Sequence, residues 1–250
     1  MLKTKLLVVA LGAAFAFPVM AEDAPASDFT PSSNVSLVSD YLYRGISQTG
    51  TKPAIQGGFD LAHSSGLYVG VWGSSISTLG DVGIPNSGTE IDTYGGYKMP
   101  IGDLGLDVGF LRYNYPGKYA AGATTADTNE LYAAVSYSIV TAKLSYSLGD
   151  TFGVAKAGGT IYPEVNASYT LADQGVVLGG HVGTQIFAGA NKGSGDASLS
   201  YLDFKVSASK DFSGYVAGLA ISGTNAKPVY TVQGNKLGKT TAVLSLSRAF

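Results

Sequence analysis

The stretch Thr-Ala-Val-Leu-Ser-Leu-Ser-Arg-Ala-Phe (241–250) lies at the end of the chain and decides the fold class. Leu244, Leu246 and Phe250 fall on one face of an extended strand, and the serines between them fall on the other. Apolar spacing of two is typical of a β-strand and excludes an amphipathic helix, which needs spacing of three or four. The stretch therefore predicts a strand with one apolar and one polar face.

The same alternation recurs along the chain, in segments separated by Gly, Pro, Asn, Asp and Ser. It predicts twelve strands, near residues 34–46, 54–63, 66–72, 90–98, 104–115, 130–137, 142–148, 164–169, 176–182, 202–208, 215–223 and 241–250. An even number is what a single-chain bacterial barrel requires. Weak segments leave ten or fourteen strands as alternatives. The predicted fold is all-β, a transmembrane antiparallel up-and-down β-barrel.

A soluble β-sandwich also alternates, so three further features favour the barrel. The strands are near ten residues long, which suits a tilted transmembrane strand. The face of each strand opposite to the apolar face is polar but mostly uncharged. Tyrosines fall on the apolar face, often at strand ends, as in the aromatic girdles of membrane barrels. These tyrosines are Tyr41, Tyr43, Tyr97, Tyr137, Tyr146 and Tyr169.

Closure gives the last strand its importance. In lipid every backbone N–H and C=O must be paired within the protein, so the last strand must pair with the first. The terminal Phe250, after alternating apolar residues, resembles the insertion signal of bacterial outer-membrane proteins. This resemblance implies contact with outer-membrane lipid and with the barrel-assembly machinery. Arg248 departs from the signal, and a basic residue there can reach the headgroups.

The N-terminus has the pattern of a secretory signal peptide. Lys3 and Lys5 precede the apolar stretch 6–17, and small residues lead to a cleavage site after Ala21. The alternative is an uncleaved anchor helix. We therefore expect a cleaved signal peptide over 1–21, a flexible periplasmic leader over 22–33 and an outer-membrane barrel over 34–250.

Composition excludes several other classes of protein. Charged residues make up only 14% of the chain, against about 25% in a typical soluble domain. The chain has no cysteine, which removes disulfides and thiol chemistry. No basic stripe predicts nucleic-acid binding. No motif predicts a metal site, a cofactor or an enzyme.

Several stretches carry a family resemblance. SDYLYRGISQT (39–49) and PAIQGGFD (53–60) are followed by GLYVGVWGS (66–74), EIDTYGGY (90–97) and YNYPG (113–117). Together they resemble the TorF family of porins over nearly the whole chain after the signal peptide. The resemblance implies an outer-membrane barrel with an unassigned substrate, and it supplies no catalytic residues.

Charged side chains on the polar face are the candidates for function, because that face of a barrel lines the lumen. We expect lumen-lining or solute-contacting roles for Asp40, Arg44, Asp60, Glu90, Asp92, Lys98, Asp107, Glu130, Lys143, Glu164, His181, Asp203 and Lys205. They would set a transverse field in the pore. The alternative is that most form ion pairs that pack a narrow interior, with Asp60 pairing with Arg44.

These observations predict a porin-like channel in the bacterial outer membrane, through which small hydrophilic solutes diffuse passively. One alternative is a structural or adhesive barrel whose own side chains plug the lumen. The other is an outer-membrane hydrolase, in which His181 would act with a carboxylate and a serine. The sequence leaves the solute and homo-oligomerisation undecided.

Overall fold

The last strand pairs with the first and closes the sheet, as the alternation at the chain's end predicts. The computed structural model describes residues 27–250. In it β16 (Thr241–Ala249) runs antiparallel to β1 (Phe29–Val38), with Leu246 opposite Leu37. Phe250 extends the pairing: its N–H donates to the carbonyl of Ser33 at 2.9 Å and its carbonyl accepts from the Ser33 N–H at 3.1 Å.

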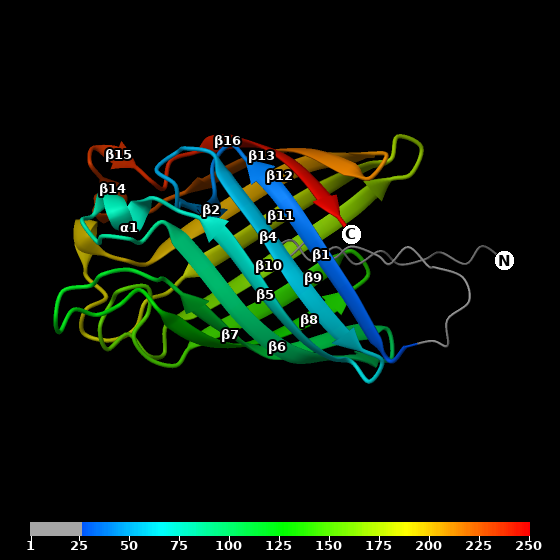
Figure 1. Ribbon diagram of the computed structural model, residues 1–250, viewed down its shortest axis with the longest axis horizontal. Coiled ribbons are helices and arrows are strands. Elements are labelled where there is room, and N and C mark those ends of the chain that lie inside the picture. Colours follow the sequence, from blue (N-terminus) through cyan, green and yellow to red (C-terminus); the bar gives the residue numbers. More distant parts are fainter. Residues whose placement is uncertain (1–26) are drawn as a thin grey trace.

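Twelve long strands form the closed barrel, and each is antiparallel to both neighbours (Figure 1). Between β1 and β16 the long strands are β4 (Ala54–His63), β5 (Leu67–Ser75), β6 (Thr89–Ile101), β7 (Leu104–Asn114), β8 (Thr128–Tyr137), β9 (Val140–Ser147), β10 (Ile161–Leu171), β11 (Val176–Gln185), β12 (Tyr201–Phe212) and β13 (Tyr215–Thr224). The predicted fold class and the count of twelve are confirmed. The predicted signal peptide, with Ala21, lies outside the described residues.

The first strand differs from its predicted bounds at both ends. It begins at Phe29 rather than Asn34, so part of the predicted leader belongs to the barrel. Pro31 made this segment look irregular, because proline cannot donate to a ladder. Pro31 is accommodated because the closing strand pairs with β1 only from Ser33 onward, which leaves the stretch around Pro31 on a locally open edge. The strand also ends early, at Val38.

The barrel carries a belt of large apolar side chains on its outside. On β13, Leu219 and Ile221 are exposed, while Ser222 on the opposite face is buried. Tyr137 and Tyr169 belong to the exposed set, at the strand ends where the sequence predicts them. Polar side chains and glycines fill the inner face.

Inner-face glycines make room for tyrosine rings that lie flat on the wall. A Cβ at Gly109 would lie 2.5 Å from the Oη of Tyr132, and a Cβ at Gly96 would lie equally close to the Oη of Tyr68. No residue other than glycine fits under these rings, since real Cβ contacts are never so short. The high glycine content therefore has a local steric reason.

The two ends of the barrel differ. At the end that holds Phe29 and Phe250, neighbouring strands join through short turns such as Gly102-Asp103. Six long connections gather at the other end (Figure 1), over residues 39–53, 76–88, 115–127, 148–160, 186–200 and 225–240. They hold the small elements β2 (Leu42–Tyr43), β3 (Ile46–Ser47), α1 (Thr78–Asp81), η1 (Gly195–Ala197), η2 (Pro228–Tyr230), β14 (Thr231–Val232) and β15 (Asn235–Lys236). Within residues 27–250, no helix has the length and apolarity to cross a membrane.

Candidate functional site

The connection between β1 and β4 folds into the barrel. Its strands β2 and β3 form a short hairpin whose turn residues, Arg44 and Gly45, both have positive φ, at 46° and 76°. Two successive left-handed residues are what a tight type I′ turn requires, and glycine is favoured at such positions. A Cβ at Gly45 would lie 2.8 Å from the Cβ of Asp203, so this turn abuts the inner wall. We call residues 39–53 the inner hairpin.

The inner hairpin corrects the predicted strand over 34–46. Tyr41 and Tyr43 do not join an outer girdle: Tyr41 is buried against Trp72, and Tyr43 packs on Tyr113 and Phe152. The error has a simple cause. The hairpin is itself extended, so the alternation continues through it although the chain has turned inward.

Hydroxyl groups hold the base of the inner hairpin together. The carboxylate of Asp40 accepts hydrogen bonds from Ser47 Oγ at 2.6 Å and from Thr49 Oγ1 at 2.9 Å. Burial raises the pKa of Asp40, and these two hydrogen bonds oppose the rise. The Ser47 N–H donates to the carbonyl of Leu237, which ties the hairpin to the connection before β16.

Arg44 reaches from the hairpin to the opposite wall of the barrel. Its guanidinium binds Glu130 on β8 through two hydrogen bonds, of 2.7 and 3.1 Å, and donates to Gln185 Oε1 on β11 at 2.7 Å. In barrel order, β8 lies four strands from β4 and β11 lies four strands from β1, the two strands that the hairpin joins. The contact therefore spans the lumen.

Arg44 is almost completely enclosed. The side chains of Arg44 and Glu130 are only 7% and 2% exposed. The guanidinium carbon also lies 4.1 Å from the ring centre of Tyr162 and 4.9 Å from that of Tyr43. A buried guanidinium needs a paired carboxylate and hydrogen-bond acceptors, and this site supplies both. Together Arg44, Glu130 and Gln185 form a layer of side chains across the lumen, which we call the arginine layer.

The predicted pairing of Arg44 with Asp60 is wrong. Asp60 instead accepts a hydrogen bond from the hydroxyl of Tyr94 at 2.6 Å. The prediction assumed that residue 44 continued β1, next to β4. Because the chain turns inward after Val38, Arg44 faces the far wall instead.

A second polar cluster occupies the inner face of β9 to β12. His181 lies 3.0 Å from Asp203 and 3.5 Å from Glu164, and Lys143 lies 3.7 Å from Glu164. Lys205 is the neighbour of His181 on β12. Both ring nitrogens of His181 have partners, which also include the Tyr162 hydroxyl and the amide of Asn166. No serine is among the hydrogen-bond partners of this histidine in the described structure, so the hydrolase arrangement is not formed.

A third cluster lies toward the end with the short turns. Lys98 is 3.9 Å from Asp107, and Tyr68 donates to Asp107 while also contacting the hydroxyl of Tyr132. The Lys98 and Asp107 side chains are 43% and 28% exposed, far more than the arginine layer. The lumen is thus more open on this side of the layer.

The two remaining candidates, Glu90 and Asp92, are buried neighbours on the inner face of β6. Glu90 Oε1 accepts from the Tyr115 hydroxyl at 3.0 Å. Glu90 Oε2 and Asp92 Oδ1 have no hydrogen-bond partner among residues 27–250. With Glu130 they make the β6–β8 wall acidic, while the β9–β12 wall carries Lys143 and Lys205 together with Glu164 and Asp203. In the described part of the chain, no group of three or more His, Cys, Asp or Glu side chains is placed to hold a metal ion.

Sequence reasoning missed Gln185 and the tyrosines that surround the layer. Tyr113 at the end of β7 and Tyr115 just after it are separated from Asp107 by even numbers of residues. This spacing predicts that they face inward, as Asp107 does. Gln185 gave no such signal, because the alternation fades after Val182 although β11 continues to Gln185.

Comparisons with known proteins agree with this architecture. A family model described as a bacterial protein of unknown function, Gcw_chp, matches residues 22–250. The TorF resemblance is not confirmed by it. No curated protein matches the chain.

Among solved structures, the NanC porin has 6% identity and a TM-score of 0.55, over 88% of this chain and 99% of that one. A membrane protein from work on in-meso crystallization has 6% identity and a TM-score of 0.51, over 88% and 83%. Pseudomonas aeruginosa OprD has 14% identity and a TM-score of 0.39, over 90% and 66%. At such low identity the likeness to the first two shows the fold alone.

Proposed function

The chain belongs to the Gcw_chp family of bacterial proteins of unknown function, and we propose that it is a porin-like channel of the bacterial outer membrane. Small hydrophilic solutes would diffuse through it passively, without a cofactor or a catalytic step. The observation that carries the proposal is the inversion of polarity. Large apolar side chains are exposed around the outside of a closed barrel, and charged side chains line its inside.

The placement in a membrane follows from this inversion. An exposed apolar belt on every strand is costly in water and favourable in lipid, and closure pairs each long strand with two neighbours. The end of the barrel with the short turns, Phe29 and Phe250 would face the periplasm, and the end with the six long connections would face the exterior. The predicted signal peptide would deliver the chain there.

The proposed pore has two parts. The open side, near Lys98 and Asp107, would admit solutes from the periplasmic end, and the inner hairpin would constrict the outer end at the arginine layer. The acidic β6–β8 wall faces a wall on which Lys143 and Lys205 lie among the carboxylates of Glu164 and Asp203, and solutes would cross the field between the two walls. The charged residues predicted to line the lumen would contact solute or tune this field.

We expect single-channel currents when the purified, refolded chain is inserted into a planar lipid bilayer. The conductance should be smaller than that of a 16–18-stranded porin measured in the same salt, because twelve strands enclose a narrower lumen. Heat-denatured protein in the same detergent is the control. If no currents appeared at any voltage, the chain would instead be a structural barrel with a plugged lumen. If the chain hydrolysed lipid esters and His181→Ala abolished that activity, the chain would instead be an outer-membrane hydrolase.

The role of Phe250 in insertion leads to a second prediction. Deleting Phe250 removes both backbone hydrogen bonds to Ser33 and one exposed apolar residue from the closing strand. We expect the deletion to lower the fraction of folded barrel in the outer membrane, measured by the gel shift between unboiled and boiled samples. Phe250→Leu keeps the backbone bonds and an apolar side chain, so it should fold nearly as well as the parent. Equal folding of the deletion and the parent would contradict this role.

A further inference from the structure

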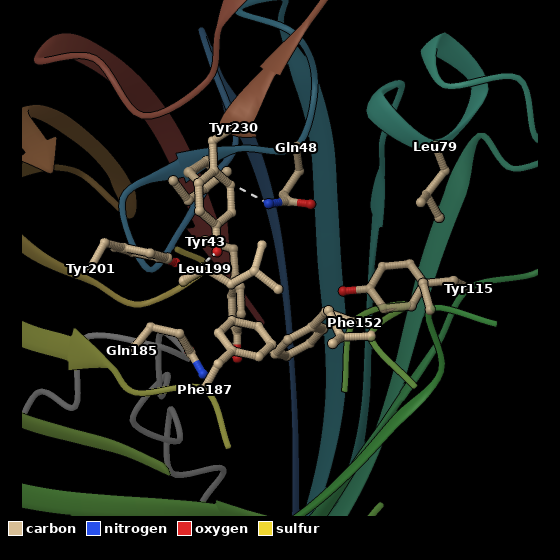
Figure 2. A pocket seen from close by; sticks show the side chains of 13 residues that line it. Tyr43, Gln48, Leu79, Tyr115, Phe152, Gln185, Phe187, Leu199, Tyr201 and Tyr230 are labelled. Atoms are coloured by element: carbon tan, nitrogen blue, oxygen red, sulfur yellow. Dashed lines mark hydrogen bonds between the residues drawn. The ribbon is translucent and has the colours of Figure 1, made fainter. Parts of the chain in front are cut away.

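An aromatic cavity lies at the loop end of the barrel, beside the inner hairpin. Its volume is about 170 Å³, and it is bounded by the hairpin, by α1 and by four of the long connections. Six of its lining residues are Tyr43, Tyr115, Phe152, Phe187, Tyr201 and Tyr230. Figure 2 shows their rings around a common space, with Leu79 and Gln48 on one side and Gln185 on the other. A solute entering from the loop end would meet this cavity next to the arginine layer.

Gln185 gives the cavity a specific polar feature. Its Oε1 must face Arg44, because a guanidinium has donors and no acceptor, and the two atoms are 2.7 Å apart. This fixes the amide and turns Nε2 away from Arg44. In Figure 2 the nitrogen end of the Gln185 side chain lies toward Phe187, among the rings. Gln185 is only 2% exposed, and Nε2 has no hydrogen-bond partner among residues 27–250.

Most other polar groups of the lining are already satisfied. The Tyr43 hydroxyl is bonded to that of Tyr113, Tyr115 donates to Glu90, and Tyr230 donates to the carbonyl of Leu199. A sugar would bring several hydroxyls into this cavity and leave most of them without hydrogen-bond partners, which disfavours its binding. The cavity therefore suits a largely apolar ring with few polar atoms.

The charges near the cavity further restrict the class of ligand that it can bind. Glu90 contacts the lining residue Tyr115, and Glu130 contacts Tyr113, whose ring packs on the lining residues Tyr43 and Phe152. The nearby Arg44 is already paired with Glu130. An anion would be repelled there. A cation would bring no acceptor to the unpartnered Nε2 donor of Gln185, and it would lie near the guanidinium of Arg44. A neutral ligand with a hydrogen-bond acceptor satisfies the donor.

We infer that this cavity binds a neutral, monocyclic aromatic solute that carries a hydrogen-bond acceptor, held by the rings and by a hydrogen bond from Gln185. The size is suitable, since an apolar protein cavity of about 150 Å³ holds benzene. Small shifts of the Gln185 side chain would bring Nε2 to the ligand. The inference rests on the proposed channel function and goes beyond it, because an aromatic solute would pause at the constriction on the path that small hydrophilic solutes also take.

The test is isothermal titration calorimetry, in which benzamide is titrated into the refolded full chain in detergent. Benzamide supplies an aromatic ring and a carbonyl acceptor, and we expect saturable binding. Benzoate, benzylammonium and cyclohexanecarboxamide have a similar size but change the charge or the ring, and each should bind at least about tenfold more weakly. Equal binding of all four, or none that saturates, would overturn the inference.

Gln185→Glu is the decisive variant, because it keeps an oxygen for Arg44 and replaces the donor with a carboxylate oxygen. It should weaken benzamide binding at least about tenfold. Gln56→Glu is the matched control, on the inner face at Ser74 and away from the cavity, and should bind as the parent does. Unchanged affinity in Gln185→Glu would overturn the role of Gln185.

A second variant covers the case in which Gln185→Glu fails to fold. Val154→Phe fills the cavity from a loop and leaves the arginine layer intact. It should abolish benzamide binding while the gel shift on boiling is kept, and unchanged binding would contradict the site. Channel currents without benzamide binding would sink only this inference. Benzamide binding without currents would leave the site standing and sink the channel.

Discussion

Replacing Arg44 by alanine is expected to raise the single-channel conductance of the reconstituted barrel several-fold. Arg44 is the side chain that joins the inner hairpin to the far wall, through Glu130 and Gln185. Its removal takes away the bulk of the guanidinium and all three hydrogen bonds. It also leaves the buried carboxylate of Glu130 unpaired, which typically costs about 3–5 kcal/mol. The hairpin should then undock and the narrowest layer should widen.

The control for this experiment is Arg112→Ala. Arg112 also forms a salt bridge, with Asp127 at 3.3 Å, but it belongs to the outward-facing row of β7 and is 40% exposed. Its loss should change conductance little, since exposed pairs contribute only about 0–1 kcal/mol. The double variant Arg44→Met, Glu130→Gln removes both charges and keeps most of the volume. We expect it to conduct less than Arg44→Ala. Equal currents in the parent and Arg44→Ala would show that the layer does not limit flow.

The second large effect concerns the outside of the barrel. Leu219 lies near the middle of β13 and is exposed on the outer face. Leu219→Arg would place a charge near the midplane of the bilayer, and a basic residue at that depth destabilises a membrane barrel by about 2–4 kcal/mol. We expect the free energy of unfolding from lipid vesicles, measured by urea titration, to fall by that amount.

The neighbouring residue supplies the matched control. Ala220 follows Leu219 on the same strand, so its side chain points to the opposite, inner face. Ala220→Arg carries the same charge at the same depth but directs it into the lumen, where water and carboxylates can accommodate it. We expect its effect on stability to be well below that of Leu219→Arg. Equal losses from the two variants would mean that β13 does not separate lipid from lumen as proposed.

The parts of the fold that sequence could predict are those set by the period of two. Ser245 and Leu246 fall on opposite faces whatever the rest of the chain does, and the same local rule located all twelve long strands. The same rule failed at Tyr41 and Tyr43, because a hairpin that turns inward alternates just as a wall strand does. The turn was not visible in the sequence, because Arg44-Gly45 stands where a type I′ turn usually has Asn-Gly.

The candidate site depends on geometry that no local pattern contains. Most of the expected charged residues do lie on the inner face, since parity alone determines the face. Which of them meet is decided by closure. Arg44 binds Glu130 only because the ring of strands brings β8 opposite the root of the hairpin. The unsatisfied nitrogen of Gln185 likewise appears only once Arg44 has fixed its amide.

The span of the arginine layer along the chain has a consequence for the order of assembly. Arg44 contacts residues that follow it by 86 and 141 positions, whereas each wall strand first pairs with a strand that is close in sequence. Contacts of such long range form late, because the intervening chain must be ordered first. We therefore expect the hairpin between β1 and β4 to stay undocked while the strands insert one after another. It would swing into place only after the ring closes, so that a nascent barrel would leak more than a mature one.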